Sequence, residues 1–164
     1  MYQFDSFADG YVLVTHTEKK YRARFRAADE ATASKIVCDL NLPAMLERLA
    51  AHRYEVETQG VEVGDITIKS DPESQAKLHS AYNSLKNGLI TTTKWKGVNG
   101  WQTVDLAGLE PIAQAVASHV AQCFDAEESV ELLLRAIEDH AELAAFDVEA
   151  EFDSAMEPEE TPPA

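Results

Sequence analysis

Histidine and cysteine are the residue types best suited to ligate a metal or act as nucleophiles, and their spacing here favours neither role. Cys38 and Cys123 lie far apart in the sequence and form no CxxC pair. The histidines show no HxxxH or HExxH spacing. They occur singly, at His16, His52, His79, His119 and His140. This pattern is typical of surface or packed side chains, so we expect no metal site.

Motifs for nucleotide binding and hydrolysis are also missing from the sequence. No GxGxxG, GxxxxGK[ST] or GxSxG segment occurs. Acidic residues are plentiful on the expected helices, but acids on helix faces are usually solvated. We therefore expect a protein that is not an enzyme and needs no cofactor, and we assign no catalytic or cofactor-binding residue.

The clearest candidate for a binding site is a stripe of alternating basic residues near the N-terminus. In residues 20–26 (KYRARFR) charged and apolar side chains alternate, as in a strand with one face in solvent. The stripe is either a cationic surface for an anionic partner or the solvated face of an amphipathic strand. Its members, which we take as candidate partner-binding residues, are Lys20, Arg22, Arg24 and Arg26.

Two tryptophans flank an expected turn at residues 97–100, between strand-like residues 89–96 and 101–105. A turn of odd length would place Trp95 and Trp101 on one face of the hairpin, and a turn of even length would place them on opposite faces. We expect both to stabilise the hairpin and its packing on an Ala-rich helix at residues 113–120. They are also kept as candidate partner-binding residues.

The charge of the chain is unevenly distributed. Its 164 residues carry a net charge of −15. Residues 1–104 are neutral overall, whereas residues 105–164 hold one basic residue, Arg135, and 16 acidic ones. This balance disfavours nucleic acid or an anionic membrane as partner of the C-terminal part. The composition, with 45% hydrophobic residues and no apolar run of about 18 residues, is typical of a globular domain.

Residues 1–55 are expected to form a small ββαα unit. Strands at 11–17 and 21–26 would form a hairpin, and helices would follow at 29–40 and 44–53. Pro43 separates the two helices, because proline disfavours the helical conformation in the residue before it.

Residues 56–146 are expected to form a strand-helix-hairpin-helix domain. A strand-like stretch ends before Ser70, and Asp71-Pro72 begins a helix that ends at Asn87-Gly88. From Asp105 onwards one long helix or two helices in series are expected. The acidic residues 147–164 are predicted to be a disordered tail. Together these elements predict an α+β fold with two antiparallel hairpins, short helices and a long C-terminal helical segment.

The central part of the chain contains a recognisable series of segments in a fixed order. They are VEVGDITIK (61–69), DPESQAKL (71–78), Trp95-Lys96, Gly100-Trp101, VDLAGL (104–109), IAQAVASHV (112–120) and QCF (122–124). In this order, residues 61–128 resemble a domain of unknown function found in tail-fibre and tail-associated proteins of tailed bacteriophages and prophages. Members commonly have Val-Asp-Gly-Ile where this chain has VGDI at residues 63–66, which is a local departure.

This resemblance implies a place in the phage tail rather than a reaction, and it assigns no catalytic residue. The expected function is a structural or connector component of the tail or tail fibre, made in the host cytoplasm and present in several copies in the virion tail. An alternative is a tail-fibre assembly chaperone that is not retained in the virion. A nucleic-acid-binding regulator that uses the basic stripe is the third and least favoured hypothesis.

Overall fold

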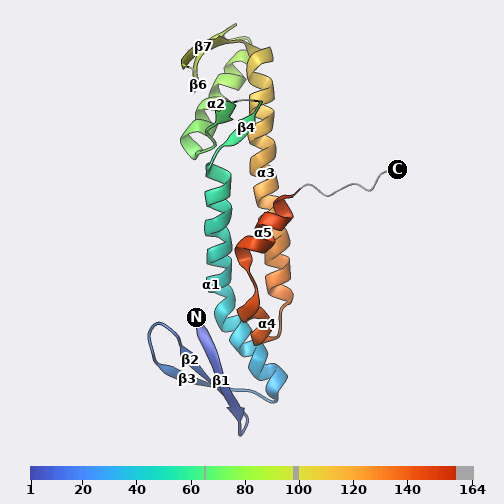
Figure 1. The fold of residues 1–164 in the computed structure, drawn as a ribbon. Helices are drawn as coiled ribbons and strands as arrows, with labels where there is room; N and C mark the ends of the chain where they lie inside the picture. Colours follow the sequence, from blue (N-terminus) through green and yellow to red (C-terminus); the bar gives the residue numbers. More distant parts are fainter. Residues whose placement is uncertain (65, 98–99, 158–164) are drawn as a thin grey trace, which may run out of the picture. The chain divides into compact units, whose positions relative to one another are not determined.

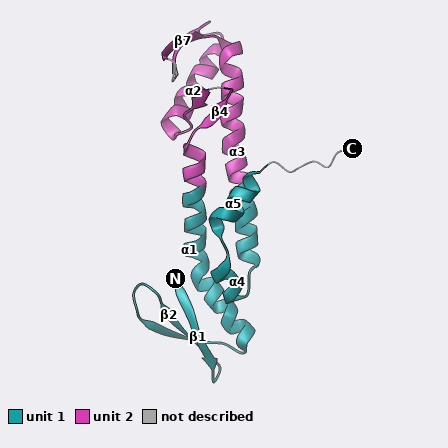
Figure 2. Cartoon of the chain, viewed as in Figure 1, with its two compact units in different colours: residues 1–52, 126–164 teal, residues 53–125 magenta. Residues whose placement is uncertain are grey.

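The structure is a computed structural model that describes residues 1–64, 66–97 and 100–157 (Figure 1). The chain divides into two compact units, which Figure 2 shows in different colours. Unit 1 consists of residues 1–52 and 126–164, and unit 2 of residues 53–125. The elements, in chain order, are β1 (Tyr2–Ala8), β2 (Tyr11–His16), β3 (Arg22–Arg26), α1 (Glu30–Thr58), β4 (Val61–Val63), β5 (Ile66–Ile68), α2 (Pro72–Lys86), β6 (Thr93–Gly97), β7 (Gly100–Val104), α3 (Leu106–Ala136), α4 (His140–Ala145) and α5 (Val148–Met156).

Unit 1 contains a three-stranded antiparallel sheet in the order β1-β2-β3. The β2–β3 hairpin was predicted and is confirmed. Strand β1 was not predicted, although a strong signal for it is present. Asp9 and Gly10 connect β1 to β2 with φ angles of 51° and 75°, the left-handed geometry that Asp-Gly favours in two-residue hairpins.

One face of this sheet packs against the first part of α1. Val12 and Val14 of the central strand are fully buried, as is Ala33 of the helix. Alternation along the strands sends every second side chain to this face. The partly buried side chains around these residues are Tyr2, Phe4, Phe7, Ala23, Phe25, Ile36 and Leu40. The opposite face of the sheet therefore carries the polar and charged side chains.

Helix α1 is continuous through Pro43, so the predicted break between two short helices is wrong. A proline inside a helix costs about 3 kcal/mol, because it removes one backbone hydrogen bond and crowds the preceding turn. Buried side chains on both sides, Val37 before the proline and Met45 and Leu49 after it, outweigh that cost. Asn41 lies inside the helix and bonds the backbone of Tyr2 twice, at 2.6 and 2.8 Å.

The prediction of disorder for residues 147–164 is wrong for the part that forms α5, while residues 158–164 lie outside the described residues. Val148 and Phe152 of this helix are fully buried. Glu149 accepts two hydrogen bonds from the guanidinium of Arg48 on α1. His52 is 2.9 Å from Asp153 and meets the ring of Phe152 edge-on. The acidic segment is amphipathic, and its apolar side chains hold it in unit 1.

Unit 2 combines two short hairpins with helices. Strands β4 and β5 pair antiparallel, as do β6 and β7, which confirms the hairpin expected around the tryptophans. Helix α2 begins as predicted: Asp71 is its N-cap and accepts the backbone N–H of Ser74 at 3.0 Å, and Pro72 is its first residue. Its last turn leads to Gly88, whose φ of 69° suits glycine.

Helix α3 is one helix of 31 residues, and the charged stretch at residues 125–131 does not interrupt it. Pro111 is the sixth residue of this helix, beyond its first turn, and removes one backbone hydrogen bond without ending the helix. The core of unit 2 contains the buried residues Ile68, Leu78, Leu85, Leu109 and Val116. Among the described residues, no helix is long and apolar enough to cross a membrane. The predicted α+β class, with antiparallel hairpins and a long C-terminal helix, is confirmed.

Candidate binding surfaces

The outer face of the unit 1 sheet carries the predicted arginines. In β3 the exposed residues Arg22, Arg24 and Arg26 alternate with the partly buried Ala23 and Phe25. Antiparallel pairing places the three arginines opposite Thr15, Leu13 and Tyr11 of β2. We call this surface, made by the three arginines and the three β2 residues opposite them, the arginine face.

The guanidinium groups of the arginine face are only loosely engaged within the chain. Arg22 lies 3.9 Å from the carboxylate of Asp5, and its side chain is 72% exposed. The Arg24 guanidinium lies 4.2 Å from the centre of the Tyr11 ring, in a cation–π contact. Arg24 and Arg26 form no ion pair with any residue that the structure describes. Positive charge therefore remains available to a partner.

Lys20 does not belong to the strand, which corrects the expected stripe of four. Its φ is 56°, so it lies in the left-handed conformation of the turn between β2 and β3, and the strand begins at Arg22. The backbone N–H of Lys20 donates to the carbonyl of His16 at 2.9 Å and closes this turn. Three of the four predicted basic residues share one sheet face, and the fourth is exposed beside it.

The register of the β6–β7 hairpin decides the position of the tryptophans. Trp95 lies opposite Gln102, and Trp101 lies opposite Lys96. The two indoles therefore belong to opposite faces of the hairpin, which is the even-length alternative. Trp95 is half-buried and packs on the unit 2 core, whereas Trp101 is 70% exposed. The expected packing role holds for Trp95 and is wrong for Trp101.

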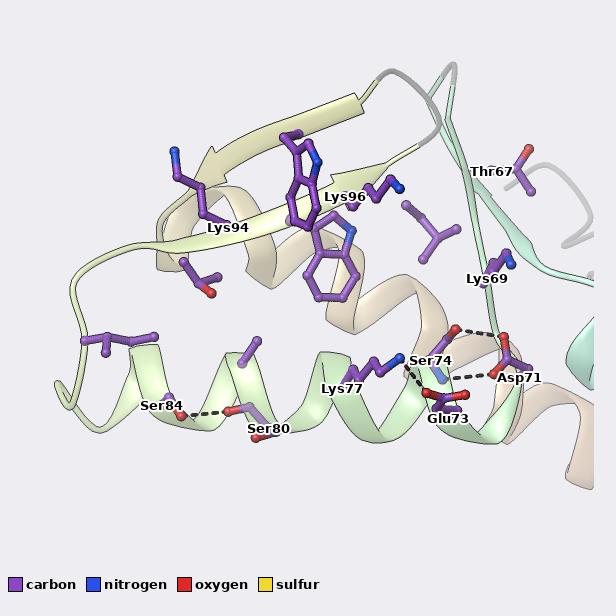
Figure 3. A pocket seen from close by; sticks show the side chains of 16 residues that line it. Thr67, Lys69, Asp71, Glu73, Ser74, Lys77, Ser80, Ser84, Lys94 and Lys96 are labelled. Atoms are coloured by element: carbon purple, nitrogen blue, oxygen red, sulfur yellow. Dashed lines mark hydrogen bonds and ion pairs between the residues drawn. The ribbon is translucent and has the colours of Figure 1, made fainter.

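Both indoles line an open groove of about 960 Å³ in unit 2. Figure 3 shows its two sides: the hairpin carries Lys94 and Lys96, and helix α2 carries Lys77. We call it the lysine–tryptophan groove. Its other lining residues are Thr67, Ile68, Lys69, Asp71, Glu73, Ser74, Ser80, Ala81, Ser84, Ile90 and Thr93.

The tryptophans of this groove were predicted as candidate partner-binding residues, whereas its lysines were not. Lys94 and Lys96 alternate with Trp95 along β6, so their pattern was visible beside it. Lys69 and Lys77 come from the end of β5 and from α2, and only the fold brings them to the same groove. The arginine face belongs to unit 1 and the groove to unit 2, so they are two separate candidate sites.

A histidine and a cysteine meet on α3, but they do not form an activated pair. His119 Nε2 is 3.8 Å from Cys123 Sγ and 3.1 Å from the carbonyl oxygen of Val56. A carbonyl can only accept, so Nε2 carries the proton and cannot take one from the thiol. Burial, and secondly the carboxylate of Glu57, raise the pKa of the Cys123 thiol. Cys123 is therefore a protonated side chain in the core.

The end of α1 is joined to the start of α2 by a buried polar network. The hydroxyl of Ser70, which is fully buried, donates to the carbonyl of Glu57 at 2.5 Å and accepts from the N–H of Gly60 at 3.0 Å. The carboxylate of Glu57 accepts from Gln75 at 3.2 Å and pairs with Arg53. In the described residues no group of three His, Cys, Asp or Glu side chains could hold a metal ion.

Comparison with known proteins identifies the family of this chain. The profile of the domain of unknown function DUF4376 matches residues 42–154. This match spans most of α1 and all later elements except the end of α5. No curated protein and no solved structure gives a significant match. The chain therefore belongs to the DUF4376 family, and the matched region is wider than residues 61–128.

Proposed function

We propose that this protein is a structural or connector component of a bacteriophage tail or tail fibre, and that it acts through protein–protein contacts. The resemblance of residues 61–128 to tail-associated proteins supports the tail context. The contact role is supported by one observation above all, the arginine face of unit 1.

Three properties of the arginine face suit a protein partner. Arginine and tyrosine are enriched at protein interfaces, and both are present here in direct contact. The three arginines are exposed, and their guanidiniums are only loosely engaged within the chain. Each carboxylate of a partner could accept two parallel hydrogen bonds from the planar guanidinium group of an arginine.

The chain itself offers such carboxylates, which favours several copies in one assembly. Between residues 138 and 153 there are seven acidic residues and no lysine or arginine. Exposed members of this segment include Glu138, Glu142 and Glu151. Each exposed ion pair contributes only about 0–1 kcal/mol, so such contacts would orient subunits rather than hold the fold together. A symmetric assembly repeats the same contact many times, so the small free energies of the individual ion pairs add up over all subunits.

Quantitative mass spectrometry of purified virions tests the proposed function. A structural component will be present in a fixed, stoichiometric amount relative to the tail proteins, and it will be made in the host cytoplasm before assembly. If the protein is absent from mature particles but is required for fibre assembly, the alternative applies: an assembly chaperone whose acidic helical end shields a fibre segment. Absence from particles together with normal assembly would contradict both.

A further inference from the structure

The face that α2 turns toward the β6–β7 hairpin is polar, which is unusual for two elements of one small unit. Its residues facing the groove include Ser74, Lys77, Ser80 and Ser84, at helical spacing. The apolar face of the same helix, with Leu78 and Leu85, packs on the unit 2 core instead. The hydroxyls of Ser74 and Ser84 already donate to Asp71 at 2.7 Å and to the carbonyl of Ser80 at 2.9 Å. Their oxygens can still accept hydrogen bonds from the hydroxyl groups of a polar ligand.

Among the described residues that line the groove, positive charges outnumber negative ones. Its two acidic residues are already engaged: Glu73 pairs with Lys77 at 2.6 Å, and Asp71 caps α2. Lys69, Lys94 and Lys96 are exposed and form no ion pair with any residue that the structure describes. Lys69 interacts electrostatically with Asp71, and the Lys94 ammonium also donates to the Thr103 hydroxyl at 2.5 Å. Four lysines and two acidic residues line the groove, and this excess of positive charge in a protein of net charge −15 favours an anionic ligand.

The aromatic part of the groove adds a flat surface beside these charges. Trp101 is 70% exposed, and Lys96, its cross-strand partner, holds its ammonium 5.6 Å from the indole ring. The face of an indole is electron-rich and attracts the weakly positive C–H groups of a sugar ring. Trp101 can therefore support a sugar ring while Lys96 pairs with a carboxylate on that ring or the next.

We propose that the lysine–tryptophan groove binds an acidic oligosaccharide whose carboxylates are separated by whole sugar units. A volume of about 960 Å³ is at the upper end of the range for ligand sites and accommodates several sugars. The inference goes beyond the proposed function and does not depend on it, because it concerns unit 2 alone.

Two other polyanions fit the groove less well. A nucleic-acid strand carries a charge at every nucleotide, so the net charge of −15 opposes it more strongly than a sparsely charged glycan. A peptide segment of aspartate and glutamate carries negative charges but has no ring that could stack on the exposed indole of Trp101.

The tryptophans provide a direct readout, because Trp95 and Trp101 are the only two in the chain and both line the groove. Titration of the full chain with hyaluronan hexasaccharide or unsulfated chondroitin hexasaccharide, which carry a carboxylate on every second ring, should change the tryptophan emission in a saturable way. The neutral sugar maltohexaose should have no effect. Added salt should weaken the binding, since ion pairs with exposed lysines are screened.

Variants separate the groove from general charge effects. The exposed pair Lys94→Gln/Lys96→Gln should weaken the binding about tenfold or more, as expected when two charge-assisted contacts are lost. Trp101→Ala should weaken it as well without unfolding the chain, because this side chain is exposed. Lys86→Gln is the matched control: Lys86 lies on α2 over the Tyr82 ring, outside the groove, and its loss should leave the affinity unchanged.

The inference is overturned if neither acidic sugar binds, or if the lysine pair variant and Trp101→Ala bind as tightly as wild type. It is also overturned if oligothymidylate or oligoglutamate binds more tightly than both sugars, since the ligand would then be a nucleic acid or an acidic protein segment. None of these results affects the proposed tail role, which is tested on virions.

Discussion

At the scale of single residues, the two tryptophans should respond differently to truncation. Trp101→Ala should change the free energy of unfolding by less than about 1 kcal/mol, because the side chain is 70% exposed. Trp95→Ala should cost about 2 kcal/mol, since the half-buried indole packs on the unit 2 core. Urea unfolding followed by far-UV circular dichroism measures both. Equal losses would mean that the two indoles do not lie on opposite faces of the hairpin.

Ser70 is a second residue with a specific energetic role. Ser70→Ala should destabilise the protein by about 1–3 kcal/mol, because the carbonyl of Glu57 and the N–H of Gly60 both lose their partner next to a buried network. Ser118→Ala, at an exposed position of α3 in the same unit, is the control and should stay within about 0.5 kcal/mol of wild type. A loss for Ser70→Ala no larger than that of the control would contradict the network.

The sequence alone predicts which residues share one face of a strand or helix. It predicts less well which faces of different elements contact each other. Alternation along β3 correctly places Arg22, Arg24 and Arg26 on one side of the sheet. It cannot place Lys20, whose conformation depends on the turn, nor can it decide the register that separates Trp95 from Trp101. The groove forms where α2 lies beside the β6–β7 hairpin, and these two elements are separate in the sequence. No local sequence pattern therefore predicts the groove.

At the scale of elements, α5 should contribute to stability although it is acidic. Deletion of residues 147–164 removes the buried Val148 and Phe152 together with the Glu149–Arg48 pair, and should cost about 4 kcal/mol. Deletion of residues 157–164 should leave folding unchanged. The two truncations are compared by urea unfolding. Equal stability of both would show that α5 does not pack in unit 1.

Aspartate caps give the helices a common response to acid. Hydrogen bonds from the Ser74 hydroxyl and N–H lower the pKa of Asp71, and backbone N–H groups do the same for Asp29 and Asp139. Because these pKa values are lower in the folded state, the caps stabilise fully above the usual pKa of 3.8 and lose this effect as the pH falls through the folded values.

Asp71→Asn tests this response, since asparagine also caps helices but does not titrate. The difference in unfolding free energy between wild type and variant should stay constant from about pH 6 to pH 5 and shrink below about pH 4. A difference that is unchanged down to pH 3 would show that the Asp71 pKa is not lowered by its cap.

Local signals explain which elements could be predicted. The Asp71-Pro72 start and Asn87-Gly88 end fix α2 from the sequence, because capping acts through neighbouring residues. Strand β1 carries an equally local Asp-Gly turn, and attention to that signal would have found it. The continuity of α1 through Pro43 could not be read locally, since it depends on buried contacts that only the folded chain provides.

At the scale of the whole molecule, seven of the 14 Lys and Arg residues of this acidic chain lie on two surfaces, three on the arginine face and four in the lysine–tryptophan groove. The net charge of −15 maintains solubility and repels identical copies at long range. The arginine face provides an attractive patch against this background, and it lies in the same unit as the acidic segment at residues 138–153. Such an arrangement favours contacts in one orientation over random association.

The central claim is that the arginine face builds the protein into the tail, and incorporation into particles tests it most directly. A phage that lacks the gene is complemented with wild type, with Arg22→Gln/Arg24→Gln/Arg26→Gln, or with a control of equal charge change, Lys35→Gln/Lys86→Gln/Arg135→Gln. Circular dichroism verifies that each is folded, and mass spectrometry counts copies per purified particle. The account predicts wild-type incorporation of the control and a loss of about tenfold or more for the arginine variant, equivalent to about 1.4 kcal/mol. Undiminished incorporation of the arginine variant, or absence of the wild-type protein from particles, would contradict it.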